Sequence, residues 1–193
     1  MLTVTDPLSH TDSFTYDSLG RVKTVTDKYG NTTEYFYDIY GNVVETKDAL
    51  NHSSYFEYDG MDRLTAVKLY RTDAQDNVVN EEQVTLYQYD GRGLLKKEIN
   101  AQNKVTVYTY DANGNLASKT DADGYVTNYA YDLKNMVEVI SYQGGKNVSF
   151  QYDKDGGLVK MVDWNVTTNF ALDALDRITS VNDHNAVKGL RQT

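Results

Sequence analysis

A Tyr-Asp dipeptide recurs at a nearly constant interval, and this period limits the possible folds more than any other feature of the chain. The dipeptides begin at Tyr16, Tyr37, Tyr58, Tyr89, Tyr110, Tyr131 and Tyr152, and a degenerate copy begins at Leu172. Six of the seven intervals are 20 or 21 residues. Such a period is typical of proteins that stack one small structural unit many times. We therefore predict a single array of about eight repeats over residues 1–193.

Each copy contains a turn that starts at the aspartate of the dipeptide. The seven aspartates are Asp17, Asp38, Asp59, Asp90, Asp111, Asp132 and Asp153. The fourth turn residue is Gly, Asn or Asp in all copies: Gly20, Gly41, Asp62, Gly93, Gly114, Asn135, Gly156 and Asp176. These residue types tolerate a left-handed backbone best, and an aspartate at the first position accepts a hydrogen bond from the backbone two residues on. The pattern predicts a type I turn closed by a residue with positive φ.

Two turns per period predict two strands per period. A second turn follows each first turn after about ten residues, for example from Asp27 to Gly30. Two aromatic residues spaced two apart, such as Tyr35 and Tyr37, precede each Tyr-Asp turn, and an aliphatic residue such as Val43 follows it. Side chains two apart in a strand share a face. We expect an all-β fold, a long antiparallel meander of about sixteen strands with aromatic rows across it.

One interval is 31 residues long, which equals one period plus ten residues. It encloses the polar stretch 71–82. We interpret this stretch as an insertion in one hairpin and not as a domain boundary, and we expect that the array tolerates its removal.

Composition excludes several classes of function. The chain has no cysteine, so it has no disulfide, no cysteine-ligated zinc and no thiol nucleophile. Its net charge of −9 argues against nonspecific nucleic-acid binding. It contains no apolar run long enough to span a membrane as a helix. No nucleophile, phosphate-loop or dinucleotide motif occurs, so we expect no enzymatic activity and no cofactor.

Three sets of residues permit a chemical interpretation, and each also has a structural one. His10, His52 and His184 lie in different repeats without a metal-ligand spacing, so we interpret them as surface residues. The clusters Asp121/Asp123, Asp153/Asp155 and Asp111/Asn113 could ligate calcium, but turn chemistry explains them and the EF-hand spacing is missing. We therefore predict no metal site.

Tyrosine rows leave a choice between packing and ligand binding. The 17 tyrosines could form an exposed surface for sugar rings, with Trp164 and the insertion as further candidates. We favour packing, because the rows recur in every copy, as a structural repeat requires. We also expect self-association, as a homodimer through sheet edges near residues 13–16 and 177–182.

The unit over residues 16–38, YDSLGRVKTVTDKYGNTTEYFYD, resembles the repeat of the Rhs/YD-repeat family. That family includes bacterial Rhs and wall-associated toxins, the C component of Tc toxins and the teneurins. The resemblance implies a spiralling sheet that forms part of a hollow shell, with the rest of a larger polypeptide and its toxic cargo as partners. It also implies a secreted or cell-surface location. We expect a piece of shell wall without protease or cargo, and a cell-surface adhesin that binds glycans is the alternative.

Overall fold

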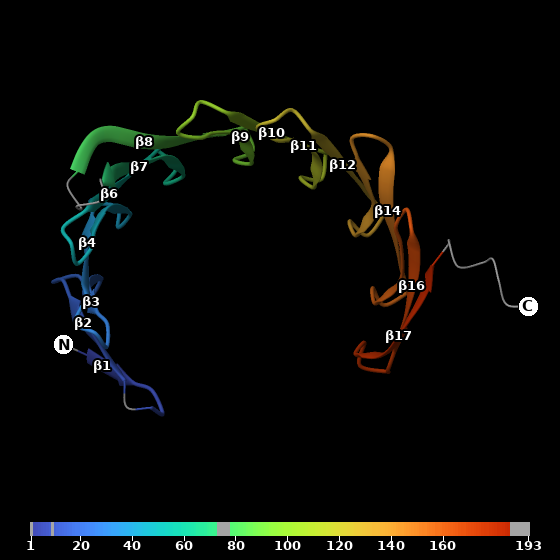
Figure 1. The fold of residues 1–193 in the computed structure, drawn as a ribbon, viewed down its shortest axis with the longest axis horizontal. Coiled ribbons are helices and arrows are strands. Elements are labelled where there is room, and N and C mark those ends of the chain that lie inside the picture. Colours follow the sequence, from blue (N-terminus) through green and yellow to red (C-terminus); the bar gives the residue numbers. More distant parts are fainter. Residues whose placement is uncertain (1, 9, 73–77, 186–193) are drawn as a thin grey trace, which may run out of the picture. The chain divides into compact units, whose positions relative to one another are not determined.

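The computed structural model describes residues 2–8, 10–72 and 78–185, and these residues form an all-β fold (Figure 1). They contain seventeen strands and no helix. Two compact units divide the chain: Met1–Asp90 with Glu98–Lys104, and Gly91–Lys97 with Val105–Thr193. An array over residues 1–193 and a spiral of the sheet stay predictions.

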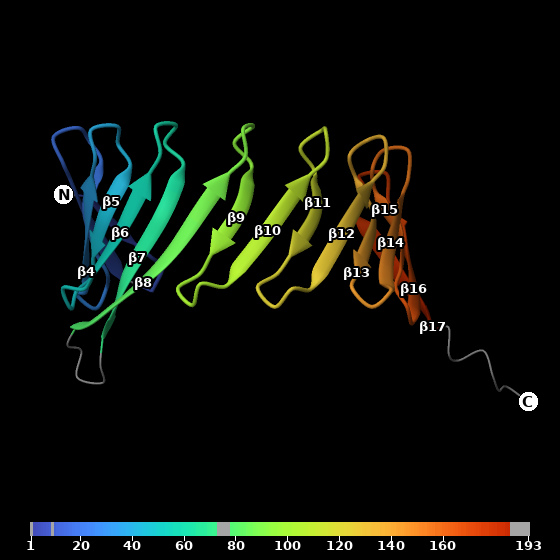
Figure 2. The same cartoon turned by 90° about the horizontal axis from the view of Figure 1, so that it is seen from above.

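The first unit is an antiparallel meander in which each strand pairs with the next one along the chain. Its strands are Leu2–Thr5 (β1), Thr11–Tyr16 (β2), Val22–Thr26 (β3), Thr32–Tyr37 (β4), Val43–Lys47 (β5), Ser53–Tyr58 (β6), Leu64–Thr72 (β7) and Val78–Tyr89 (β8). Within this unit the Tyr-Asp turns lie along one edge and the second turns along the opposite edge (Figure 2).

The second unit repeats this meander from β10 to β17. Its strands are Val105–Tyr110 (β10), Leu116–Thr120 (β11), Val126–Tyr131 (β12), Val137–Tyr142 (β13), Lys146–Tyr152 (β14), Leu158–Val162 (β15), Val166–Leu172 (β16) and Ile178–Asn185 (β17). Strand β9, Leu95–Ile99, has residues in both units.

A register shift follows each Tyr-Asp turn and determines which side chains share a face. In β2 and β3, Thr15 faces Thr24, but Tyr16 faces Val22 because the register shifts between the two pairs. The extra residue, Lys23, is accommodated as a bulge. The tyrosine and the aliphatic residue after the turn therefore lie on the same face. The same shift recurs in β4–β5, β6–β7, β10–β11, β12–β13, β14–β15 and β16–β17.

The sheet is a single layer without a conventional core. Among the described residues, Ala66 and Thr168 are the buried ones, with 1% and 7% of their surfaces exposed. The opposite face carries polar pairs, such as the hydroxyls of Thr15 and Thr24 at 2.6 Å. Local turn and inter-strand contacts must therefore supply most of the order that a core supplies elsewhere.

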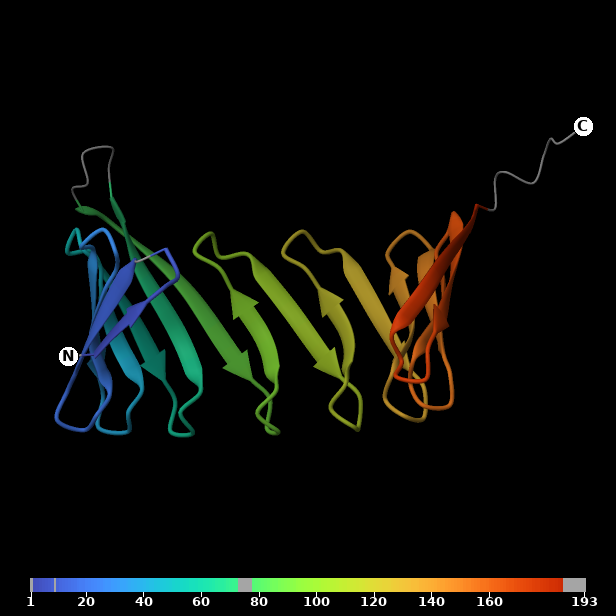
Figure 3. The same ribbon diagram turned by 90° about the horizontal axis from the view of Figure 1, so that it is seen from below.

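One expectation about the strands needs correction. The segment near residues 13–16 is not terminal, because β1 precedes it and pairs with β2. The sequence Asp-Pro-Leu-Ser-His at residues 6–10 lacks the Gly, Asn or Asp found at the fourth position of the Tyr-Asp turns, so the sequence pattern did not predict a turn there. Within the insertion, residues 71–72 pair with residues 78–79, and this pairing lengthens the hairpin of β7 and β8 (Figure 3). Residues 73–77 lie outside the described residues.

Candidate functional site: the Tyr-Asp turns

The turn at Asp17 shows how one carboxylate organises five residues. The backbone N–H of Asp17 donates to the carbonyl of Arg21 at 2.9 Å, and its own carbonyl accepts the N–H of Gly20 at 3.1 Å. Its Oδ1 accepts two further N–H groups, from Leu19 and Arg21, each at 2.9 Å. The turn donors that the sheet leaves free are thus bound by one side chain, which explains the requirement for aspartate.

The same carboxylate pattern recurs at both edges. It is found at Asp38, Asp59, Asp111, Asp132, Asp153 and Asp173 along the Tyr-Asp edge, and at Asp6, Asp27, Asp48 and Asp121 along the other. Asp163 closes a turn that is one residue shorter, and its Oδ1 accepts the N–H groups of Asn165 and Val166. These bonds favour the ionised form. The N–H of Arg21 is the largest cause that lowers the pKa of Asp17, and the side chain of Arg63 is the largest that lowers the pKa of Asp59.

The fourth residue of every Tyr-Asp turn has a left-handed backbone. The φ angles are 79° at Gly20, 99° at Gly41, 58° at Asp62, 85° at Gly93, 91° at Gly114, 63° at Asn135, 100° at Gly156 and 57° at Asp176. The predicted positive φ is therefore confirmed at all eight copies.

The residue four positions after the aspartate is a functional position that the sequence reasoning missed. Its side chain reaches the second carboxylate oxygen: Arg21 Nε lies 2.7 Å from Asp17 Oδ2, and Asn42 Nδ2 lies 3.1 Å from Asp38 Oδ2. A signal was present, because Arg or Asn stands at this spacing in most copies. Such a charge-assisted bond stabilises the turn further.

The tyrosine of the dipeptide links successive repeats. Each of these tyrosines ends a strand, and its hydroxyl donates to the carbonyl of the aliphatic residue after the preceding Tyr-Asp turn. The bonds are Tyr37 to Val22 (2.6 Å), Tyr58 to Val43 (3.0 Å), Tyr89 to Leu64 (2.8 Å), Tyr110 to Leu95 (2.8 Å), Tyr131 to Leu116 (3.0 Å) and Tyr152 to Val137 (2.8 Å). Tyr16, in β2, is 42% exposed. Leu172 has no hydroxyl, so this link ends there.

Neighbouring turns are also joined directly, in two ways. Arg21 donates to the backbone carbonyl of Asp38 in the next turn at 3.2 Å. Asn42 instead donates to the Asp62 carboxylate at 2.8 Å. In the second unit, Asn135 Oδ1 accepts the amides of both Asn113 and Asn115, at 2.9 and 2.8 Å. Asp62 and Asn135 are therefore partners of the asparagine one turn earlier, and not degenerate copies of a glycine.

The structure does not bring the three histidines together. His10 and His52 lie four residues after Asp6 and Asp48, at the position that Arg21 has after Asp17. Their Nδ1 atoms lie 2.9 and 3.2 Å from the Oδ2 atoms of those aspartates. His184 lies in β17 and is exposed. His10 and His52 thus have the turn role that Arg21 has at the other edge, which their spacing from an aspartate could have indicated.

The acidic pairs likewise serve the turns. Asp121 Oδ1 accepts the N–H of Asp123, and Asp153 Oδ1 accepts that of Asp155. Within the described residues, no group of three His, Asp or Glu side chains could hold a metal ion. The same part of the chain has no helix that is long and apolar enough to cross a membrane.

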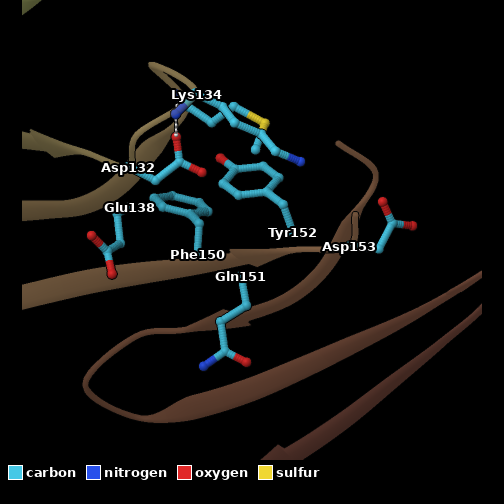
Figure 4. A pocket seen from close by; sticks show the side chains of 8 residues that line it. Asp132, Lys134, Glu138, Phe150, Gln151, Tyr152 and Asp153 are labelled. Carbon is cyan, nitrogen blue, oxygen red and sulfur yellow. Dashed lines mark hydrogen bonds between the residues drawn. The ribbon is translucent and has the colours of Figure 1, made fainter. Parts of the chain in front are cut away.

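An open depression lies between consecutive Tyr-Asp turns on the aromatic face. In the second unit it is lined by Asp132, Lys134, Phe150, Tyr152 and other residues (Figure 4). The two rings lie side by side while Gln151 between them points away, as strand alternation requires. The first unit has a depression at the equivalent repeat positions, between Asp38 and Asp59.

Comparisons with known proteins give a family match and a set of similar structures. A family model described as teneurin YD-shell matches residues 1–137. A search of curated proteins finds no match. The chain is similar to two structures titled "Crystal Structure of TcdB2-TccC3-Cdc42" and "Crystal Structure of TcdB2-TccC3-TEV", with TM-scores of 0.45 and 0.46 and 12% identity. It is also similar to a Photorhabdus luminescens Tc holotoxin pore, with a TM-score of 0.45 and 12% identity. Each match covers 93% of this chain and 13% of the solved chain.

Proposed function

The chain belongs to the teneurin YD-shell family, and we propose that it is a structural wall segment with no catalytic role. The observation that carries this proposal is the hydroxyl-to-carbonyl bond that ties each hairpin to the one before it. The repeated aspartates are likewise engaged with the backbone of their own turns. The side chains that define the repeat are thus used to hold a continuous sheet, which is what a wall requires.

We further propose that this wall encloses or presents a toxic domain of a larger bacterial polypeptide that acts outside the cell. The support is the resemblance of residues 16–38 to Rhs repeats and the match to a family described as a shell. The partners of the segment would be the rest of that polypeptide and its cargo.

Native proteolysis of the complete polypeptide tests enclosure. We expect a fragment outside the repeats to resist protease while the shell is folded and to be cut rapidly after denaturation. Electron microscopy of the same sample should show a hollow particle. A cargo that is cut equally fast before and after denaturation would contradict enclosure.

Glycan binding is a second candidate function, favoured by an exposed aromatic cluster at the second edge. Trp164 is 49% exposed and Tyr142 is 40% exposed. Their rings pack edge to face, with the ring centroids 6.4 Å apart. The flat apolar faces of such rings can stack against sugar rings. Trp164 is the single tryptophan of the chain, so its fluorescence can be titrated with soluble cell-wall polysaccharide. A saturable change that Tyr142→Ala weakens would support binding, and an unchanged spectrum would exclude it at this cluster.

Self-association through sheet edges is a further proposal, because edge strands readily pair with other chains. Sedimentation velocity over a wide concentration range tests it. We expect a dimer at high concentration, and a folded species that stays monomeric throughout would contradict it.

A further inference from the structure

The chain shows how the space between two Tyr-Asp turns can hold a guanidinium group. The guanidinium carbon of Arg21 lies 4.4 Å above the ring of Tyr37, its Nε bonds Asp17 Oδ2 at 2.7 Å, and its Nη1 bonds the Asp38 carbonyl at 3.2 Å. A second arginine, Arg63, lies 4.7 Å above the tyrosine of the turn that follows it. Cation–π contact and a carboxylate thus act on one cation together.

At the turn between these two, an asparagine replaces the arginine. Asn42 bonds Asp38 Oδ2 at 3.1 Å and Asp62 Oδ1 at 2.8 Å. No described cationic side chain lies over Tyr58 in the way that Arg21 lies over Tyr37. An open depression of about 410 Å³ is found there, lined by aromatic and acidic side chains without a lysine or arginine. Its lining includes Tyr40, Phe56, Tyr58, Asp38, Asp59 and Asp62, together with Asn42.

The charge around this depression favours a cation. Arg63 pairs with Asp59 at 2.7 Å, but Asp38 and Asp62 form no ion pair within the described residues. Burial and the carboxylate of Asp38 raise the pKa of Tyr58, which also indicates a negative surrounding. Residues 1–90 hold 16 acidic and 7 basic side chains, so they carry the whole net charge of −9. A positive partner is therefore attracted, whereas a nucleic acid or an anionic lipid surface is repelled.

The equivalent depression in the second unit differs in its charge, because a lysine lines it. Lys134 stands at the position of Tyr40 and lines this depression (Figure 4), and its Nζ donates to the carbonyl of Lys154 at 2.6 Å. That depression therefore has a cation of its own. In the first unit, the tips of the flanking turns are instead apolar and exposed: Tyr40 is 77% and Met61 75% exposed. Aromatic residues and methionine are enriched in protein-binding surfaces relative to the rest of a protein's surface.

We propose that the depression between the turns Asp38–Gly41 and Asp59–Asp62 binds an arginine side chain of a protein partner, with apolar neighbours of that arginine against Tyr40 and Met61. The guanidinium takes the place over Tyr58 that Arg21 occupies over Tyr37. Arginine fits better than lysine, because its planar fork can stack on the ring and donate to two acceptors together. This recognition role goes beyond the proposed wall function and does not depend on it.

A peptide titration tests the guanidinium requirement. The probe is the blocked peptide Ac-Gly-Leu-Arg-Leu-Gly-NH₂, added to the full chain and followed by NMR of tyrosine and methionine side chains. We expect saturable shifts at Tyr40, Tyr58 and Met61, with at least tenfold weaker binding of the peptide in which uncharged citrulline replaces arginine. Equal affinity for the two peptides, or shifts spread evenly over the chain, would overturn the proposal.

Three variants locate the site. Asn42→Arg should fill the depression from within, as Arg21 does one turn earlier, and should weaken peptide binding at least tenfold while the amide spectrum stays that of a folded chain. Asp62→Asn should weaken binding severalfold. Asn115→Arg, which makes the same change in the second unit, is the matched control and should leave binding unchanged. Wild-type affinity in a folded Asn42→Arg chain would show that the peptide binds elsewhere.

Discussion

Replacing Gly114 by valine isolates the cost of a left-handed backbone at a Tyr-Asp turn. Gly114 has a φ of 91°, and a Cβ added there would lie 3.8 Å from Leu94 Cδ1, an ordinary contact distance. The substitution therefore introduces strain without a clash. A β-branched residue in the left-handed region costs about 1–2 kcal/mol. For a chain of this size, that loss lowers the melting temperature by about 2–8 °C.

A matched substitution separates backbone strain from the mere addition of a side chain. Gly114→Asn also adds a Cβ, but Asn135 shows that asparagine is accepted at this turn position, with a φ of 63°. We expect Gly114→Asn to lose much less stability than Gly114→Val in thermal unfolding followed by circular dichroism. Equal losses in the two variants, or an unchanged melting temperature for valine, would refute the strain argument.

Three further predictions concern the links, the turns and the insertion. Tyr131→Phe removes the hydroxyl bonded to Leu116, so denaturant titration should show a loss of about 0.5–1.5 kcal/mol; Tyr125→Phe, at an exposed turn residue, should show none. Folding lowers the pKa of several turn aspartates, including Asp17 and Asp59, from 3.8. Their contribution to stability is therefore complete above that value and is lost as the pH falls through the folded pKa, and a melting temperature that is constant from pH 6 to pH 2 would contradict it. Deleting residues 72–81 restores the 21-residue interval and should leave the amide spectrum of the other repeats in place, whereas a collapsed spectrum would show that the long hairpin is needed for folding.

Turn positions and strand faces could be predicted from the sequence because both depend on local chemistry. An aspartate followed three residues later by Gly, Asn or Asp constrains four consecutive residues, and alternation then assigns the faces. The first turn shows the limit, since Asp6 and His10 close a turn whose sequence lacks that mark.

Contacts between repeats could not be predicted in the same way. The hydroxyl link joins residues 15 positions apart, such as Tyr58 and Val43, and depends on the bulge that brings both to one face. The hydrogen bond between Asn42 and Asp62 spans 20 residues. Within a single copy, Asp62 therefore looks like a mere substitute for the usual turn glycine. Asn135 likewise resembles an ordinary turn residue within its own copy, although its Oδ1 accepts the amide groups of Asn113 and Asn115 from the preceding turn.

The two kinds of contact between turns have different consequences for how such an array can grow by gene duplication. Arg21 bonds a backbone carbonyl, which every turn supplies, so a duplicated unit that begins with an arginine-type turn fits before any neighbour. Asn42 bonds a side chain that only the next turn carries. A tandem copy of residues 38–58 would place Gly41 opposite Asn42, and the amide would lose its acceptor. Expansion of the gene by one period is therefore neutral at some boundaries and costly at others, and asparagine-type turns should be inherited together with the turn that follows them.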